Sequence, residues 1–236
     1  MPLAPRHFAE KCTECNYRTL RLFCNLNNDA LEHLDKIGIP VALPGRAVLF
    51  NEHQRATGVF VVCEGQLKLS AMSREGRVMI LRLAGPGDVL GLSAVLNNMP
   101  YEVTAETLEP TALKSIHRAE FMEFLQTHAE VGEKTSHVLA KEYREVFLDA
   151  RRLALSGSAS GRLAQLLLEW ANTAACGKPE LRFTMALTHE ELANMAGTSR
   201  ETVTRLLNQF ERDHLITRRG SMMTILNPGS LGQFAQ

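Results

Sequence analysis

Arg200, Glu201 and Arg205 lie close together in a stretch that also carries the small polar residues Thr204 and Asn208. At 100° per residue, an α-helix places these five side chains on one side. The other side is apolar and consists of Val203, Leu206, Leu207 and Phe210. A guanidinium group can donate two hydrogen bonds to a guanine edge, and a carboxylate can accept one from a cytosine amino group. Such a helix has the chemistry to read bases in the major groove.

Two start signals and a turn position this helix. Thr188 with Glu191 is a capping-box pattern, and Thr198 with Glu201 is a second one. Gly197 lies between the two predicted helices, where the chain must turn sharply. This order predicts a helix-turn-helix. Ser199, at the start of the second helix, is placed to contact a phosphate.

An alternative interpretation needs no nucleic acid. Glu201 and Arg205 are four residues apart and could form an ion pair on a solvated helix. The preceding helix, cap and glycine turn favour DNA binding over this alternative.

The segments around the predicted helix pair complete a winged helix-turn-helix. An amphipathic helix is expected over 162–173 and a short strand over 181–187. Apolar runs at 215–217 and 223–225 flank a predicted hairpin tip that contains Arg218 and Arg219. We expect these two arginines to contact phosphates, which adds affinity but no sequence information.

The overall charge does not indicate a partner. Lys plus Arg and Asp plus Glu each number 26, so any DNA-binding surface must be local. The N-terminal residues contain no apolar run typical of a signal peptide, and no stretch of about 18 apolar residues predicts a membrane span. We therefore expect a cytoplasmic protein that makes no membrane contact.

Three of the five cysteines, Cys12, Cys15 and Cys24, have the spacing C-x2-C-x8-C. Thiolates at this spacing can bind zinc or an iron–sulfur cluster, or the thiols can respond to redox state. The alternative is a loose N-terminal arm with incidental thiols. A fourth ligand is not evident, and the candidates are Cys63, Cys176, His7 and His117. Cys63 lies in an apolar run and is better explained as a buried strand residue.

The region from Pro40 to Ile116 consists of short alternating apolar runs separated by Gly, Pro and Asn, which is typical of an antiparallel β-sandwich or barrel. Strands are expected over 47–50, 58–62, 66–71, 78–83, 103–108 and 112–116, and a helix is expected before them, over 29–39. The glycine-rich stretch 85–91 could hold a phosphate, but tight turns explain its glycines equally well. An enzyme with a cupin-like metal site is disfavoured, because His53 and His117 are far apart in sequence.

A long helix is predicted from about Glu130 to Leu153, after a short one over 117–128. It repeats an apolar heptad pattern, which predicts a dimer seam. The seam residues are Leu139, Tyr143, Val146, Ala150 and Leu153. The alternative is a helix that packs only on its own domain. Small residues over 156–161 predict a hinge.

With these parts in order, the chain resembles the cyclic-AMP receptor / fumarate-nitrate regulator (CRP/FNR) superfamily of bacterial transcription factors. The stretch Gly197 to Leu207 is similar to the family's recognition helix, 87–92 to its barrel signature, and 160–164 to its hinge-helix start. The resemblance implies an α+β fold with four parts. These are an N-terminal cysteine-containing arm (1–28), a cyclic-nucleotide-binding-like β-roll (29–127), a dimerisation helix (128–154) and a winged helix-turn-helix domain (155–236).

The resemblance also implies a function, that of a non-enzymatic, homodimeric regulator on palindromic DNA, with RNA polymerase as a further partner. Arg200 and Arg205 would read guanines, Glu201 a cytosine, and Thr188 and Ser199 would contact phosphates. Arg200 favours a half-site like TGTGA, whereas Thr204 stands where the fumarate-nitrate branch has Ser.

The effector is predicted to be something other than cyclic AMP. Leu92 replaces the family's ribose-binding Glu, and Glu102-Val103 replaces its phosphate-binding Arg-Ser pair. Cys12, Cys15 and Cys24 resemble the iron–sulfur ligands of the fumarate-nitrate branch, but the matching late-barrel region 111–114 has no fourth Cys. We therefore expect a response to redox state or to an unidentified small effector. The alternative is a metal- or iron–sulfur-binding redox protein in which DNA binding is secondary.

Overall fold

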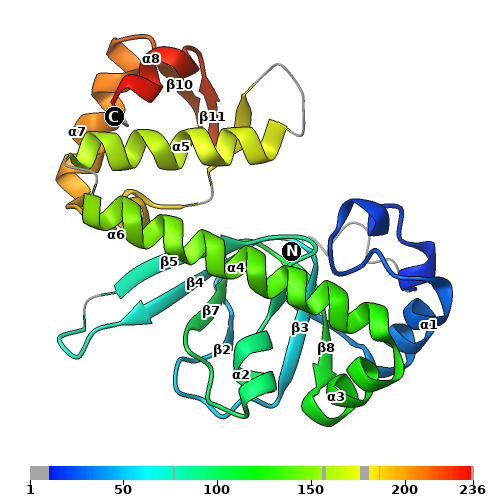
Figure 1. Cartoon of the computed structure of the whole chain (residues 1–236). Helices are drawn as coiled ribbons and strands as arrows, with labels where there is room; N and C mark the ends of the chain where they lie inside the picture. The colour runs from blue at the N-terminus through cyan, green and yellow to red at the C-terminus, as the bar shows by residue number, and fades with distance from the viewer. Residues whose placement is uncertain (1–10, 77, 156–157, 176–180, 186, 235–236) are drawn as a thin grey trace. The chain divides into compact units, whose positions relative to one another are not determined.

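A computed structural model describes residues 11–76, 78–155, 158–175, 181–185 and 187–234 of the chain (Figure 1). The chain divides into two compact units. The first consists of Met1–Arg77 and Leu81–Val146, and the second of Val78–Ile80 and Phe147–Gln236. Each unit is described by itself.

The first unit begins with an arm of two short 3-10 helices, η1 (Cys12–Glu14) and η2 (Arg18–Leu20). Helix α1 (Asn28–Ile37) follows and lies beside η1 (Figure 1). The N-cap of α1 is Asn27, whose side chain accepts a hydrogen bond from the Ala30 N–H, so the helix begins one residue before the expected range 29–39 and ends two residues before its end. Ala30, Leu31 and Leu34 form the buried face of α1.

Two four-stranded antiparallel sheets form the β-roll. One has the order β1-β8-β3-β6 and the other β2-β7-β4-β5. Their bounds are β1 (Ile39–Leu43), β2 (Val48–Phe50), β3 (Gly58–Glu64), β4 (Leu67–Met72), β5 (Val78–Ala84), β6 (Val89–Leu90), β7 (Thr104–Thr107) and β8 (Thr111–His117). The six expected strands are confirmed to within two residues at each end. Strands β1 and β6 and the short helix α2 (Leu92–Asn97) were not expected from the pattern.

An aromatic stack fills part of the core between the sheets. The Tyr101 and Phe50 rings lie 4.0 Å apart between centroids, and Phe60 stacks on Phe50 at 5.6 Å. The buried Tyr101 hydroxyl donates to the carbonyl of Gly58 at 2.7 Å, so its polar atom is satisfied. Gly91 has φ +81°, and a Cβ there would lie 2.8 Å from the Tyr101 ring, so the turn before α2 requires glycine.

Helices α3 (Arg118–Thr127) and α4 (Ala129–Leu155) end the β-roll and confirm the expected short and long helices. Phe121 and Phe124 of α3 are fully buried. An ion network joins β5 to α4: the Arg82 guanidinium lies 2.8 Å from Glu142 and 3.4 Å from Glu145. The β-roll is thereby connected to the middle of the long helix.

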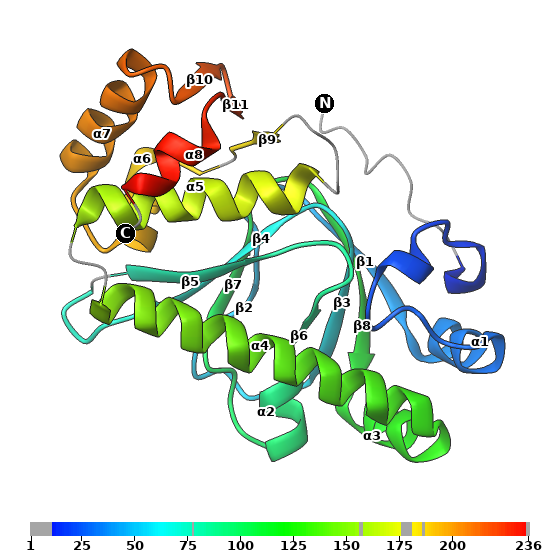
Figure 2. The same ribbon diagram turned by 45° about the horizontal axis from the view of Figure 1, so that its top comes forward.

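In the described part of the second unit after α4, helices and strands surround a helix-turn-helix pair (Figure 2). Helix α5 (Ala159–Ala175) is crossed by α8 (Pro228–Gln233), and the pair α6 (His189–Ala196) and α7 (Arg200–Arg212) packs beside it. Strands β9 (Arg182–Thr184), β10 (Ile216–Arg219) and β11 (Met222–Ile225) form a sheet of order β10-β11-β9. The expected winged helix-turn-helix is confirmed, with α5 starting three residues earlier than predicted.

Candidate nucleic-acid interface

Helix α6 begins with the predicted capping box. The Thr188 Oγ1 accepts from the Glu191 N–H, and the Glu191 carboxylate accepts from both the N–H and the hydroxyl of Thr188. The helix ends at Gly197, which has φ +59° in the left-handed region. The turn that separates the two helices is therefore built as the sequence predicted.

The second predicted capping box, Thr198 with Glu201, is wrong by one residue. The N-cap of α7 is Ser199, whose Oγ accepts from the Thr202 N–H at 3.2 Å. Gly197 is left-handed and Ser199 is extended, so helical geometry begins only at Arg200. Ser199 and Thr188 therefore use their hydroxyl groups as helix caps, while their expected phosphate contacts stay predictions.

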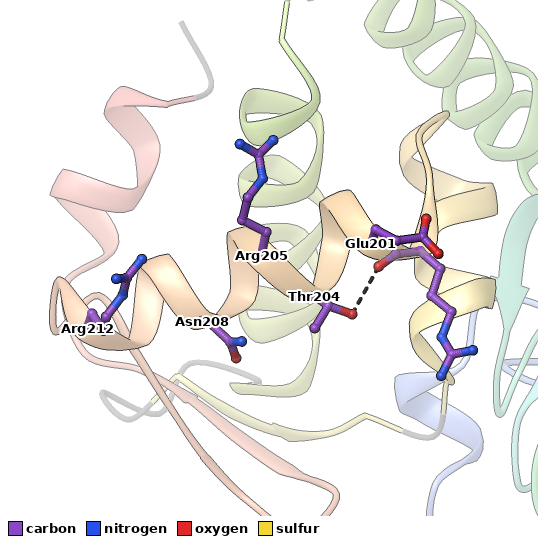
Figure 3. Close-up of a pocket in the computed structure, with 6 residues that line it drawn as sticks. Glu201, Thr204, Arg205, Asn208 and Arg212 are labelled. Atoms are coloured by element: carbon purple, nitrogen blue, oxygen red, sulfur yellow. Dashed lines mark hydrogen bonds between the residues drawn. The ribbon is translucent and has the colours of Figure 1, made fainter.

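The faces of α7 are divided as expected. Val203, Leu206, Leu207 and Phe210 are buried, with Val203, Leu207 and Phe210 fully inaccessible. The polar side chains surround an open hollow of about 740 Å³ (Figure 3). The hollow is lined by Arg200, Glu201, Thr204, Arg205, Asn208 and Arg212. Since apolar packing holds the helix from behind, this row of donors and acceptors is presented as one surface.

The two arginines expected to read guanine are both exposed. Figure 3 shows Arg205 pointing away from Glu201, and among the described residues the alternative ion pair between these two side chains is not formed. The Glu201 N–H and Ser199 hydroxyl hold the pKa of the exposed Glu201 carboxyl below its usual range. Glu201 is thus ionised at neutral pH, as an acceptor of a cytosine amino proton must be.

Thr204 is held from two sides. Its Oγ1 donates to the Arg200 carbonyl oxygen at 3.0 Å, one helical turn earlier. The same oxygen lies 2.8 Å from Nδ1 of His189, the first residue of α6. Burial, together with the charges of Arg218 and Arg200, lowers the pKa of His189. His189 was not expected from the sequence to take part in the site.

The wing differs from the expected basic tip. Arg218 and Arg219 lie within strand β10, and the turn itself is Gly220-Ser221, with Gly220 at φ +61°. The Arg218 guanidinium donates to Glu211 at 2.8 Å and to Asn208 at 2.6 Å. Arg218 therefore joins the wing to α7, because its donors are directed at the protein rather than outward. Arg219 is exposed.

Arg162, in the first turn of α5, holds the helix-turn-helix from the other side. Its Nε donates to the Ala196 carbonyl oxygen at 2.7 Å, and its Nη2 donates to that of Gly197 at 3.2 Å. These carbonyls end α6, where no further helical turn can satisfy them. The sequence marked 160–164 as a helix start but contained no local signal for this contact.

Comparison with known proteins agrees with this geometry. The Crp-like helix-turn-helix domain model matches residues 161–234, and the cyclic nucleotide-binding domain model matches residues 40–128. The probable transcriptional regulator flp of Lacticaseibacillus casei is 30% identical, covering 96% of this chain and 99% of the relative. The chain belongs to the CRP/FNR superfamily of transcription regulators. It carries the helix-turn-helix domain with which regulators of this family bind DNA.

Two further relatives extend the comparison over most of this CRP/FNR regulator. A CRP-like cAMP-activated global transcriptional regulator of Mycobacterium tuberculosis is 27% identical, covering 91% of this chain and 96% of the relative. The structure of FixK2 from Bradyrhizobium japonicum has a TM-score of 0.74 at 21% identity, covering 85% and 98% of the two chains, and shows the same fold. The curated relatives regulate transcription and are not enzymes, which confirms the prediction of a non-enzymatic protein.

The cysteine arm of this CRP/FNR regulator lies against the β-roll. Cys24 lies near Cys15 and Cys63, and Lys114 lies near Cys12 and Cys63. Burial raises the pKa of both Cys12 and Cys24 to about 12, whereas metal ligation requires thiolates. His7 and Cys176, two candidate fourth ligands, lie outside the described residues.

These residues do not fit an iron–sulfur cluster. Within the described ranges, no three Cys, His, Asp or Glu side chains converge in a way that could hold a metal ion. The late-barrel region where the resemblance places a fourth Cys carries Lys114, which is buried and ion-paired with Asp35. The Asp35 carboxylate also accepts from the Cys12 N–H at 2.8 Å. A buried ammonium group thus occupies the position from which a ligand would be expected.

The cyclic-nucleotide positions also depart from the family pattern. Leu92 is buried at the start of α2, and Glu102 is exposed. In the glycine-rich stretch, the Asp88 carboxylate accepts from the Gly85 N–H at 3.0 Å, and Gly87 has φ +96°. These are the features of tight turns, so the structure favours turns over a phosphate cradle here.

The predicted dimer seam lies on α4. Tyr143 and Val146 are 74% and 59% exposed, and Phe147, which the heptad pattern did not include, is 57% exposed. Leu139 instead packs against its own β-roll core. The side chains of Ala150 and Leu153 lie outside the described part of the chain. Apolar side chains at this exposure are typical of a surface that a partner covers.

None of the described helices combines the length and the apolar character needed to cross a bilayer.

Proposed function

We propose that this CRP/FNR regulator binds palindromic DNA as a homodimer and reads a half-site like TGTGA in each major groove. The observation that carries the proposal is the exposed row of Arg200, Glu201 and Arg205 on a helix whose opposite face is buried. Two guanidinium groups and an ionised carboxylate match two guanines and one cytosine.

The homodimer rests on α4. Tyr143, Val146 and Phe147 place three large apolar side chains on the exposed part of the long helix. A second copy of the same helix would cover them in a two-stranded seam. Two recognition helices related by the dimer axis then require a palindromic site. Such a dimer would work in the bacterial cytoplasm and contact RNA polymerase.

The signal is redox state or a small effector other than cyclic AMP. An apolar residue at position 92 and a carboxylate at position 102 provide no clamp for a ribose and a cyclic phosphate. The free thiols of Cys12, Cys15, Cys24 and Cys63 are the groups through which a redox response would act. The alternative, a metal-binding redox protein in which DNA binding is secondary, finds no ligand set among the described residues.

Selection of bound duplexes from random DNA, run in air and without oxygen, tests the proposal. The expected result is a palindrome with TGTGA-like half-sites and different enrichment under the two conditions. A protein that enriches no sequence under either condition contradicts the DNA-reading function. Equal enrichment under both conditions contradicts the redox response alone.

The substitution Arg200→Ala is expected to weaken binding to the selected palindrome by about 1–3 kcal/mol and to relax the preference at one guanine. The reason is the loss of a two-bond contact to one base edge. Competition binding against each single-base variant measures this. Arg219→Ala is the matched control, since the loss of an exposed wing arginine is expected to weaken binding to all sequences alike. Uniform weakening by Arg200→Ala would identify a phosphate contact instead.

A further inference from the structure

The Thr204 hydroxyl has little hydrogen-bonding capacity left for a base. A hydroxyl has one proton to donate and two lone pairs. Thr204 Oγ1 donates its proton to the Arg200 carbonyl oxygen, so the 2.8 Å contact with His189 requires His189 Nδ1 to be the donor. At most one lone pair remains.

The methyl group of Thr204 is the part that remains available. Thr204 lines the hollow on the exposed face of α7 together with Arg200, Glu201 and Arg205. Figure 3 shows its hydroxyl directed along the bond to the preceding turn, so the methyl group points elsewhere. A threonine methyl on a recognition helix can contact the C5 methyl group of thymine, which only that base presents in the major groove.

We propose that Thr204 reads a thymine through its methyl group, and that His189 is the positioning residue that keeps the Thr204 hydroxyl turned toward the protein. This inference rests on the proposed DNA reading by α7. It deepens that function by assigning one base preference to an apolar contact. It also gives His189, a residue of the first helix of the pair, a role in specificity without contact to the base.

The test uses the palindrome obtained by selection. Each thymine in turn, on either strand of the half-site, is replaced by deoxyuridine, which lacks only the C5 methyl group. For the wild-type protein, one of these replacements is expected to weaken binding about fourfold, the loss for one methyl-sized group that is no longer buried. Thr204→Ser removes the protein's methyl group, so the same replacement should then have no further effect.

Thr204→Val is the matched variant, because it keeps a methyl group and replaces the hydroxyl at nearly the same volume. It is expected to stay sensitive to the uracil replacement. The opposite pattern, with sensitivity kept by Ser and lost by Val, would show that the hydroxyl is the reading group and would overturn the proposal. Equal sensitivity in all three proteins would overturn it as well.

The positioning role of His189 is tested by rescue. His189→Ala should reduce the sensitivity to uracil, because the Thr204 hydroxyl then keeps only its bond to the Arg200 carbonyl and the side chain is held less firmly. His189→Asn should restore it, since the amide nitrogen can donate from near the place of Nδ1. Full sensitivity in His189→Ala would overturn the positioning role.

The two proposals fail in different ways. If the protein prefers no sequence, the proposed function fails. If it prefers the palindrome but tolerates uracil at every position, only the inference about Thr204 fails.

Discussion

Four polar side chains of the helix pair and the wing have their hydrogen-bonding groups directed at the protein itself. Thr188 and Ser199 cap α6 and α7, Thr204 bonds to His189 and to the Arg200 carbonyl, and Arg218 bonds to Glu211. Arg200, Glu201 and Arg205 are exposed and line the hollow on α7. At the scale of single residues, the polar base-reading chemistry proposed for α7 is therefore concentrated in three side chains, and the hydrogen bonds of their polar neighbours stabilise the helix pair and the wing.

His189 makes the stability of the second unit depend on pH. Its pKa is lowered in the folded protein by burial and by the charges of Arg218 and Arg200. The unfolded chain therefore binds a proton more readily, and stability falls as the pH drops through the ordinary histidine range, near 6.5, toward the lower folded value. Melting temperatures measured at pH 7.5 and 5 are expected to show this loss.

The comparison protein for this experiment is His189→Asn, which keeps a donor toward Thr204 and does not titrate. Its melting temperature is expected to fall less over the same pH interval. The other histidines contribute equally to the pH dependence of both proteins. An identical loss in the two proteins would show that His189 does not contribute.

At the scale of elements, amphipathic helices were predicted well and two short strands were not. The pattern of α7 is local, because Val203, Leu206, Leu207 and Phe210 recur at helical spacing. Strand β1 carries Pro40 and is largely exposed or half-buried, and β6 has two residues, so neither shows an alternating pattern. Their strand geometry comes from pairing with β8 and β3, which are distant in sequence.

The candidate site was predictable to a similar extent. The residues of α7 follow from periodicity and caps, whereas Arg162 bonds to carbonyls more than thirty residues away and is invisible to a local pattern. The cysteine spacing predicted a ligand set, but the arm places Cys12 beside Lys114 and Asp35, whose pairing spans 79 residues. Contacts between distant segments decided both outcomes.

The pair of Lys114 and Asp35 connects β8, α1 and the cysteine arm, so its loss should loosen all three. Lys114 is 3% exposed, and Lys114→Met leaves the Asp35 carboxylate without its cation. We expect a loss of about 3 kcal/mol in the free energy of unfolding, measured in urea. The double variant Lys114→Met/Asp35→Leu should recover much of this loss because no uncompensated charge remains. A single-variant loss below about 1 kcal/mol would contradict a buried, structurally important pair.

At the scale of the whole molecule, the formal net charge is zero, so attraction to DNA must come from where charges are placed. Three arginines, Arg200, Arg205 and Arg212, line one face of α7, and only one carboxylate, that of Glu201, joins them there. A dimer doubles this local positive surface without changing the balance of the chain.

Assembly is expected to depend on the exposed part of α4. Val146→Glu places a carboxylate in the proposed seam, where two copies would bring like charges together in an apolar contact. We expect a shift from dimer to monomer in sedimentation velocity and a loss of about tenfold or more in affinity for the full palindrome, of order 1.4 kcal/mol. Arg144→Glu, on another side of the helix, is the control for an added carboxylate. A Val146→Glu protein that remains dimeric would exclude the seam.

The two bonds from Arg162 to the carbonyls that end α6 have a mechanical consequence. They connect the first turn of α5 to the bend immediately before α7, within one compact unit. A rotation of α5 would therefore carry α7, the proposed base-reading helix, with it as one rigid block. A signal that reorients α5 would therefore reach the proposed base-reading helix without a change in the internal geometry of the helix-turn-helix.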